Sequence, residues 1–416
     1  MQHLRISLLS AVALLASSNI NAQNVIADWN TIGSTTIVTN GGQSPGPAGI
    51  WFAYASLAVY DAVNAVHHQK FQPFYYSGHV RSGASDEAAA VAAAHRVLVN
   101  YFPGQQANLD AQFNNSLNAI VAGPRAKAEG VNVGEASATA LISERTGDGL
   151  NANVPYTPGS GPGVWQPTPP GFLPAVAPWL GQMRPFTLQS AGQFLPDGPT
   201  ALTSEEWAAD YNVTRLFGDV NSTLRTPAQT EIGLFWTPNT AQQYSRAFND
   251  LVQHYSLDVL DSARLLAMLW TGYADAGIGC YNAKYTYNFW RPVTAIRAGG
   301  DHPDLTADAN WTPLATTPSH PEYPAAHACL TGAVSSLVAD FFGTRQVHVV
   351  VTSTAFSDGV HTHTFENTED WLNEIYWARI FAGFHFNHSL QDGAALGRQV
   401  AAQLFEKHFG VEHAPR

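Results

Sequence analysis

Residues 318–342 read PSHPEYPAAHACLTGAVSSLVADFF, a segment broken by three prolines that runs directly into an alanine-rich one. Pro324 suits the start of a helix, because the first backbone N–H groups of a helix have no partner inside it. Small and apolar residues then continue as far as Phe342, which predicts a helix over 325–342. The N–H groups at its start, from Ala325 onward, are suited to face an anion.

The same helical spacing of apolar residues recurs along most of the chain. It predicts further helices over 51–66, 85–102, 106–121, 126–145, 204–217, 226–236, 240–255, 258–275, 369–386 and 390–408. Strand patterning is scarce, and its best candidate is 347–352. Nine of the 25 prolines lie between Pro155 and Pro185 among large apolar residues, which predicts an ordered excursion rather than a solvated linker. The sequence therefore predicts an all-α helical bundle with long proline- and glycine-rich connections, forming one domain over 23–416.

The composition bounds the class of protein. Of the 416 residues 45% are hydrophobic, so a sizeable core is available. Only 12% are charged, and acidic residues outnumber basic ones to give a net charge of −12. This balance argues against a general nucleic-acid-binding protein and against attachment to anionic lipid through a polybasic face. No segment is long and apolar enough to predict a membrane span.

The N-terminus has the layout of a secretory signal peptide over 1–22. An apolar stretch over 8–16 follows a basic residue, and the small Ala22 stands at the predicted cleavage site. We therefore expect an exported protein, in the periplasm or outside the cell. Export permits a disulfide between Cys280 and Cys329, and two buried free thiols are an equal alternative.

Three segments together contain the cations and histidines of a candidate site. The first, KYTYNFWRP, starts at Lys284 and contains Arg291. Its seven-residue spacing is close to two helical turns, which predicts both cations on one face of a helix. The second is the proline-broken segment, which leads into a helix containing His327. The third, RIFAGFH, runs from Arg379 to His385 on a predicted helix rich in aromatic residues.

These segments, all within 280–392, favour an oxyanion site. Glu322 is the only carboxylate inside them, and an unpaired cation among apolar neighbours is costly unless an anionic ligand joins it. Arginine offers a planar fork to oxyanions and lysine a point charge. The pattern predicts a tetrahedral oxyanion held by Lys284, Arg291 and Arg379, with one histidine attacking and the other handling a proton. Each residue alone would more often be a surface charge or a core histidine.

The order Lys-x6-Arg-Pro, Pro-x-x-His and Arg-x5-His resembles the signature shared by vanadium-dependent haloperoxidases and type 2 phosphatidic acid phosphatases (PAP2). The string Phe289-Trp290-Arg291-Pro292 is more similar to the haloperoxidase branch. The DWN start at 28–30 and the GQSPGP turn at 42–47 resemble bacterial members of that branch. The similarity therefore spans most of the chain.

The resemblance implies paired four-helix bundles around one oxyanion, which is vanadate in a haloperoxidase and the phosphate of an ester in a phosphatase. It implies that Lys284, Arg291 and Arg379 bind the equatorial oxygens. His385 would be the axial ligand of vanadium, or the nucleophile toward phosphorus. His327 would be the acid–base residue. The substrates would be hydrogen peroxide and halide, or a phosphate ester.

Three positions depart from the family pattern. Ala325 stands where the family has a serine, which removes a hydroxyl donor worth about 1.5–3 kcal/mol against a charge. The backbone N–H of Ala326 can still donate to the oxyanion. Ala378 and Ser389 stand where many phosphatases have a serine and the aspartate that orients the nucleophilic histidine, and the nearest carboxylate is Asp392. These losses weaken the phosphatase hypothesis and leave a catalytically silent oxyanion-binding protein as a third one.

One other group of residues has the composition of a metal site. Asp358, His361 and His363 form a D-x-x-H-x-H string that could bind zinc, with a further ligand from Asp301, His302 or Glu322. A chain with 16 histidines produces such spacings by chance, so we favour a polar loop. The leading hypothesis is an exported vanadium-dependent haloperoxidase, followed by an acid phosphatase that uses the same site.

Overall fold

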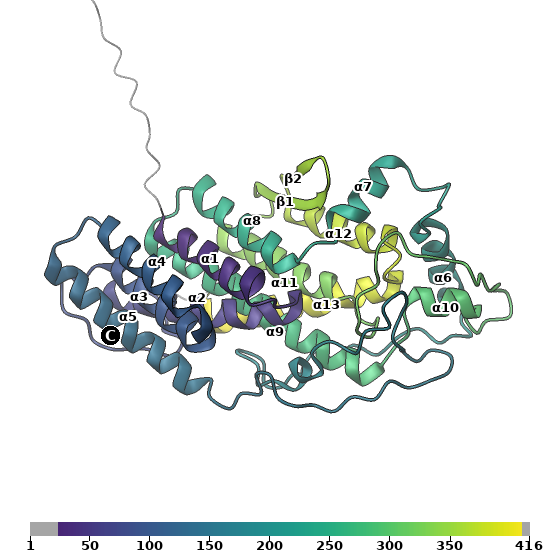
Figure 1. Ribbon diagram of the computed structural model, residues 1–416, viewed down its shortest axis with the longest axis horizontal. Coiled ribbons are helices and arrows are strands. Elements are labelled where there is room, and N and C mark those ends of the chain that lie inside the picture. The colour runs from purple at the N-terminus through teal and green to yellow at the C-terminus, as the bar shows by residue number, and fades with distance from the viewer. Residues whose placement is uncertain (1–23, 410–416) are drawn as a thin grey trace, which may run out of the picture.

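The computed structural model describes residues 24–409, so the predicted signal peptide over 1–22 lies outside the described residues. The described chain is mostly helical with one small hairpin, which confirms the predicted all-α class. Figure 1 shows an elongated molecule, with the helices of the N-terminal half gathered toward one end. The assignment of 23–416 to a single domain stays a prediction.

The N-terminal helices form the first bundle. They are α1 (Val25–Ser34), α2 (Pro45–Val66), α3 (Asp86–Tyr101), α4 (Gln106–Ala119) and α5 (Pro124–Glu144). Side chains fix two of their starts, because Asn24 accepts from the first N–H groups of α1 and Ser85 accepts from the N–H of Ala88. Helix α2 is buried along nearly its whole length and packs against α3 and α5.

The C-terminal half supplies the remaining helices and the hairpin. The helices are α6 (Glu205–Gly218), α7 (Pro227–Phe235), α8 (Thr240–His254), α9 (Val259–Tyr287), α10 (Pro292–Ala298), α11 (Ala326–Phe342), α12 (Thr368–Phe381) and α13 (Asn387–Leu404). The hairpin pairs β1 (Val349–Phe356) antiparallel with β2 (Gly359–Phe365), so a strand is confirmed where 347–352 was the best candidate. Helix α9 packs against α2 of the first bundle and against α11 and α13 of the C-terminal half (Figure 1).

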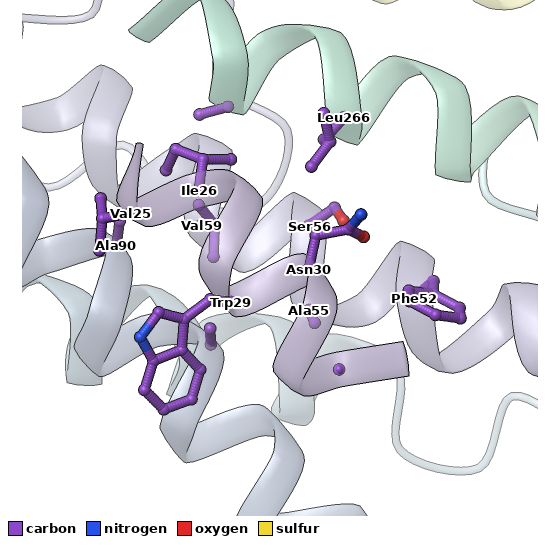
Figure 2. Close-up of a pocket in the computed structure, with 13 residues that line it drawn as sticks. Val25, Ile26, Trp29, Asn30, Phe52, Ala55, Ser56, Val59, Ala90 and Leu266 are labelled. Atoms are coloured by element: carbon purple, nitrogen blue, oxygen red, sulfur yellow. The ribbon is translucent and has the colours of Figure 1, made fainter. Parts of the chain in front are cut away.

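A small void lies in the first bundle between α1, α2 and α3, against α9 (Figure 2). It measures about 30 Å³ and is lined mainly by apolar side chains, including Phe52 and Leu266. Gly33 and Ala90 border it, so small residues at a helix contact leave the space unfilled. None of the three cation-containing segments borders this void.

The prediction that Lys284 and Arg291 of the first motif lie on one face of the same helix is wrong. Helix α9 runs beyond the predicted end at residue 275 as far as Tyr287, and it stops because Asn288 adopts a left-handed φ of 52°. Arg291 is extended and caps the start of α10, because a residue that precedes a proline is disfavoured in the helical region. Lys284 and Arg291 therefore belong to different elements.

The third motif also departs from its predicted helix over 369–386. Helix α12 ends at Phe381, and Gly383 takes a left-handed φ of 76° that reverses the chain. A side chain at this glycine would lie 2.7 Å from the carbonyl oxygen of Gly218, so only glycine fits this turn. His385 consequently lies in the turn between α12 and α13 rather than on a helix. The sequence also failed to predict α1 and α10.

The proline-rich excursion over 155–185 is ordered against the helices, as the sequence predicted. Trp165 is fully buried, and the N–H of Val176 donates to the carbonyl of Ser319 at 2.8 Å. Cys280 and Cys329 are buried free thiols, which is one of the two alternatives. Within the described residues no helix is long and apolar enough to span a membrane.

Candidate active site

A cleft of about 520 Å³ is lined by residues of the second and third motifs. Four of the predicted site residues line it, namely Ala326 and His327 at the start of α11, Arg379 near the end of α12, and His385 beyond it. Arg291 does not line the cleft but hydrogen bonds to residues that do. Further lining comes from the start of α2, from α9, from α11 and from neighbouring loops, including Gly46, Val176, Pro238, Tyr281, His320, Leu330 and Phe384.

Lys284 is fully buried and saturated by backbone carbonyls. Its Nζ donates to the carbonyl oxygens of Pro321 at 2.9 Å, Glu322 at 2.9 Å and Pro324 at 2.5 Å. An ammonium group has three protons, so all of its donors are used. Burial lowers the pKa of Lys284 to about 8. Lys284 therefore holds the second motif in place, and its role as an oxyanion ligand stays a prediction.

Arg291 joins the second and third motifs. Its Nε donates to the carbonyl of His320 at 2.8 Å, and one terminal nitrogen donates to the carbonyl of Phe384 at 3.1 Å. The same nitrogen lies 3.2 Å from Nε2 of His385. Burial lowers the pKa of Arg291 to about 10, which leaves the guanidinium charged at neutral pH. Arg291 thus places a fixed positive charge directly beside His385.

Arg379 is the least satisfied of the three cations. The side chain is 1% exposed, and one terminal nitrogen donates to the carbonyl of Trp236 at 2.8 Å. The guanidinium lies over the ring of Phe384, 4.7 Å from its centroid. Its Nε has no hydrogen-bond partner among the residues that the structure describes. Burial and the nearby charge of Arg291 lower its pKa to about 9.

His385 is held by a carboxylate that the sequence did not assign to it. Its Nδ1 lies 2.7 Å from Oε1 of Glu322, which also accepts the backbone N–H of Phe386 at 3.1 Å. Burial and the charges of Arg291 and Lys284 hold the pKa of His385 well below its usual range, so the imidazole is neutral. Burial raises the pKa of Glu322 to about 7.

The pairing of Glu322 with His385 joins residues 63 positions apart. Sequence reasoning sought an orienting carboxylate four residues after His385 and found Ser389 there. The second motif supplies the carboxylate instead. The available signal was that Glu322 is the only carboxylate inside the three motifs.

His327 is also hydrogen bonded to residues outside the motifs. Its Nε2 lies 2.7 Å from the hydroxyl of Thr240, and its ring hydrogen bonds to the carbonyl of Trp236. The same carbonyl accepts from Arg379, so the two site residues share an anchor. Burial and the charge of Arg379 keep the pKa of His327 well below its usual range. A neutral imidazole that lines the cleft is suited to accept or return a proton.

The start of α11 has no side-chain cap. Ala325 occupies the N-cap position and offers no acceptor to the first N–H groups of the helix. Ala326, the first helical residue, lines the cleft. A helix start without a cap favours an anion near its N–H groups.

The charges of the site fit an oxyanion. Lys284, Arg291 and Arg379 are 0–1% exposed, and none forms an ion pair with a carboxylate within residues 24–409. Three buried cations face one carboxylate, Glu322, whose raised pKa of about 7 leaves it partly protonated at neutral pH, so at least two positive charges are uncompensated. The orphaned Nε of Arg379 and the uncapped helix start add unused donors. A doubly charged tetrahedral oxyanion such as vanadate, or the phosphate of an ester, would supply both the charge and the acceptors.

Comparisons with known proteins support this interpretation. A family model described as the VCPO second helical-bundle domain matches residues 264–411, which contain all three motifs. The resemblance to the vanadium haloperoxidase family is confirmed. Vanadium chloroperoxidase of Curvularia inaequalis is 29% identical over 223 residues, which are 46% of this chain and 36% of that protein. The chain thus matches about a third of the length of this curated relative.

Two solved haloperoxidase structures share the fold over nearly the whole chain. A bacterial vanadium-dependent iodoperoxidase has a TM-score of 0.78 at 22% identity, covering 92% of this chain and 96% of the other. A holo-type bacterial vanadium-dependent chloroperoxidase has a TM-score of 0.71 at 16% identity, covering 89% and 93%. At these identities the similarity establishes the haloperoxidase fold.

The histidine pair of the hairpin forms ion pairs with carboxylates. His361 lies 3.0 Å from Glu231 and 3.1 Å from Asp358, while His363 lies 2.6 Å from Glu374 and 3.1 Å from Glu231. All four ring nitrogens therefore face carboxylate oxygens, which favours the polar alternative over a zinc site.

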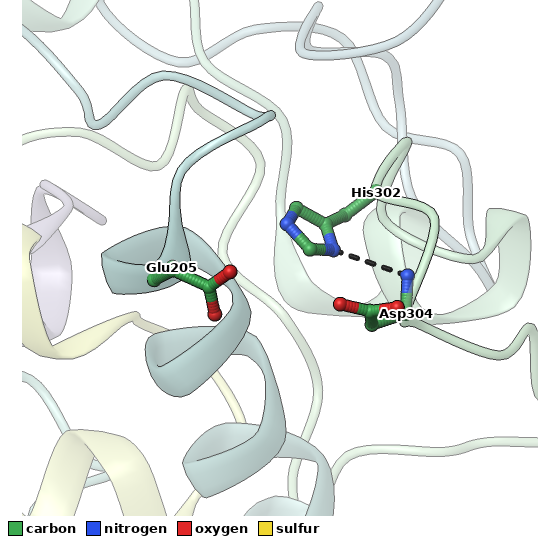
Figure 3. A group of neighbouring side chains, drawn as sticks. All are labelled: Glu205, His302 and Asp304. Carbon is green, nitrogen blue, oxygen red and sulfur yellow. Dashed lines mark hydrogen bonds between the residues drawn. The ribbon is translucent and has the colours of Figure 1, made fainter.

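A second group, Glu205, His302 and Asp304, brings potential ligand atoms within 4.8 Å of one another (Figure 3). Nδ1 of His302 accepts the backbone N–H of Asp304 at 3.2 Å, and both carboxylate residues are exposed. A histidine whose lone pair is engaged in this way is a poor metal ligand. The group therefore does not indicate a metal centre.

Proposed function

We propose that this chain is a vanadium-dependent haloperoxidase that oxidises halide with hydrogen peroxide, and that its cleft binds vanadate. The observation that carries the proposal is Arg379, a buried cation with a free Nε and no carboxylate partner in the described chain. Vanadate would supply the activation of hydrogen peroxide toward halide. The residues of the chain would bind the oxyanion, hold it in position and move protons.

The contacts of each site residue support a separate role in oxyanion binding or proton transfer. Arg379 would donate its free Nε–H to the oxyanion, together with the N–H of Ala326 at the uncapped helix start. Arg291, whose nitrogens already hydrogen bond to residues that line the cleft, would add its positive charge beside His385. His385 would bind vanadium through Nε2, because its other ring nitrogen is engaged by Glu322. His327, anchored by Trp236 and Thr240, takes and returns the proton.

Acid phosphatase activity is the second candidate, and one observation favours it. The neutral His385 with a carboxylate on Nδ1 has the arrangement of an activated nucleophile, which the sequence alone did not predict. In that reaction Nε2 would attack phosphorus and the P–O bond to the leaving group would break. His327 would protonate the departing oxygen, and water would then release phosphate from the histidine. Because its low pKa leaves His327 neutral, it would first have to take up a proton, which a monoprotonated phosphate ester can supply.

A paired assay on purified protein separates the candidates. One arm follows halogenation of monochlorodimedone with vanadate, peroxide and bromide or chloride, and the other follows hydrolysis of p-nitrophenyl phosphate without vanadate. We expect vanadate-dependent halogenation in wild type and none in His385→Ala. Ester hydrolysis inhibited by vanadate would make the protein a phosphatase. Vanadate binding without turnover in either arm would make it an oxyanion-binding protein.

We also propose that the protein is exported to the periplasm or beyond the cell, on the basis of the signal-peptide pattern over 1–22. N-terminal sequencing of protein recovered from the exported fraction should begin at Gln23. Recovery only inside the cell with an intact N-terminus would contradict export.

A further inference from the structure

Glu322 connects the second motif to the third. Its side chain is fully buried, and its Oε1 accepts from Nδ1 of His385 at 2.7 Å and from the N–H of Phe386 at 3.1 Å. The first contact fixes the imidazole ring, and the second fixes the turn that carries it. One carboxylate oxygen therefore holds both the side chain and the backbone beside the cleft.

The proton on His385 can be assigned from its two neighbours. Arginine has only donors, so the contact of 3.2 Å between Arg291 and Nε2 requires a lone pair on Nε2. A neutral imidazole then has its proton on Nδ1, where Glu322 accepts it. Both contacts favour the same tautomer, and the shorter one, to the carboxylate of Glu322, contributes more. That tautomer leaves the lone pair on Nε2, the nitrogen that would bind vanadium or attack phosphorus.

The position of Glu322 is itself fixed by the first motif. Nζ of Lys284 donates to the carbonyl of Glu322 and to those of Pro321 and Pro324 on either side. A buried ammonium with three carbonyl acceptors holds this turn against rotation. Lys284, Glu322 and His385 thus form a chain of contacts through all three motifs.

We propose that Glu322 is the positioning residue of His385, and that it replaces the aspartate absent at position 389. Its carboxylate keeps the proton on Nδ1, so the Nε2 lone pair, which accepts from Arg291, would be able to bind vanadium once Arg291 turns to the oxyanion. It also makes that nitrogen a stronger donor, as partners on the second nitrogen of ligating histidines do. Ser389, which stands where the aspartate of phosphatases would be, lies near this carboxylate, and its buried hydroxyl has no hydrogen-bond partner in the described chain. The proposal rests on the oxyanion site proposed above.

Vanadate affinity tests the proposal without requiring turnover. Calorimetric titration of the protein with orthovanadate would compare wild type with Glu322→Gln, Glu322→Ala and the double variant Glu322→Ala/Ser389→Asp. We expect Glu322→Ala to lose about 10–100-fold in affinity. Glu322→Gln, which keeps an acceptor but no charge, should lose less. The double variant should recover part of the loss, because the new carboxylate enters the space that Glu322 leaves.

The matched control is Asp110→Asn. Asp110 also pairs with a histidine, lying 2.8 Å from Nε2 of His95, but both residues belong to the first bundle. This variant should bind vanadate as wild type does. Affinity unchanged in Glu322→Ala, with wild type binding, would overturn the proposal. No binding by wild type would instead contradict the proposed function.

The tautomer can be measured with no ligand at all. In two-bond ¹H–¹⁵N spectra of histidine-labelled protein, the pattern lost in His385→Ala belongs to His385. We expect the Nδ1–H tautomer in wild type and in Glu322→Gln, and a shift toward Nε2–H or a mixture in Glu322→Ala. A purely structural role would leave the tautomer unchanged. An Nε2–H form in wild type would overturn the proposal, and circular dichroism would confirm that each variant is folded.

Discussion

Two buried arginines, one in each half of the molecule, have opposite surroundings. Arg145, at the end of α5, is 2% exposed; its Nε pairs with Asp148 at 2.7 Å, and its terminal nitrogens donate to the carbonyls of Pro185 and Arg184. Arg379 is equally buried and has one backbone acceptor, an orphaned Nε and no carboxylate partner in the described chain. Both lie over a phenylalanine ring.

The difference separates a structural charge from a functional one. A buried cation whose donors are all satisfied within the protein is costly to remove, because its carboxylate partner would be left unpaired, and it has nothing left to offer a ligand. A buried cation with unused donors destabilises the protein until an anion completes it. Burial alone is the same for both residues, so the partners decide the interpretation.

Replacing Arg145 tests the structural side and should have the largest effect. Arg145→Leu leaves Asp148 buried without its cation, which should lower the free energy of unfolding by about 3–5 kcal/mol. Urea denaturation followed by circular dichroism measures this. Activity per folded molecule should remain close to wild type. A free energy of unfolding equal to that of wild type would contradict the structural assignment.

The same substitution at Arg379 should have the opposite profile. Arg379→Leu removes an oxyanion donor, so activity should fall about 10²–10³-fold, while the free energy of unfolding stays level or rises. Steady-state kinetics and urea denaturation on one preparation give both values. The control is Arg398→Leu, which breaks a half-exposed ion pair with Glu369 and should change neither strongly. A large loss of stability in Arg379→Leu would contradict the assignment of Arg379 as a functional rather than a structural charge.

Two glycines test whether packing governs the first bundle. A Cβ at Gly49 would lie 2.3 Å from the ring of Tyr273, so Gly49→Ala should cost about 1–3 kcal/mol of stability. A Cβ at Gly33 would make ordinary contact with Phe52 at 3.7 Å and face the void of Figure 2. Gly33→Ala should therefore add about 0.5–1 kcal/mol, from helix propensity. Thermal unfolding would measure both changes in stability. A change of the same sign in the two variants would contradict the packing described here.

Two histidines three residues apart give the smallest effect. His385 is neutral, whereas the hydrogen bond to Asp392 raises the pKa of His388 to about 9. A raised folded-state pKa gives stability that is fully present below the unfolded value of about 6.5 and is lost as pH rises through about 9. Partial exposure limits this to about 1 kcal/mol or less. Urea denaturation at several pH values should show a shallower decline between pH 6.5 and 9 in His388→Gln, and an identical profile would contradict the assignment.

The sequence predicted most of the helices because the apolar spacing that defines them is local. It misplaced the ends that matter to the site, since the left-handed turns at Asn288 and Gly383 follow from tertiary packing rather than from periodicity. The residue types of the oxyanion site were visible in three short motifs. The pairings of these residues were not, because Glu322 lies 63 positions from His385, and Trp236 and Thr240 lie outside the motifs altogether.

The most direct test of the central claim is a calorimetric titration of orthovanadate into wild type, Arg379→Leu and Arg145→Leu, at a temperature where all three are folded. The account predicts one vanadate per chain in wild type, displaced by phosphate, with binding greatly weakened in Arg379→Leu and retained in Arg145→Leu. No binding in wild type, or equal binding in Arg379→Leu, would show that the buried cations of the C-terminal half do not form an oxyanion site.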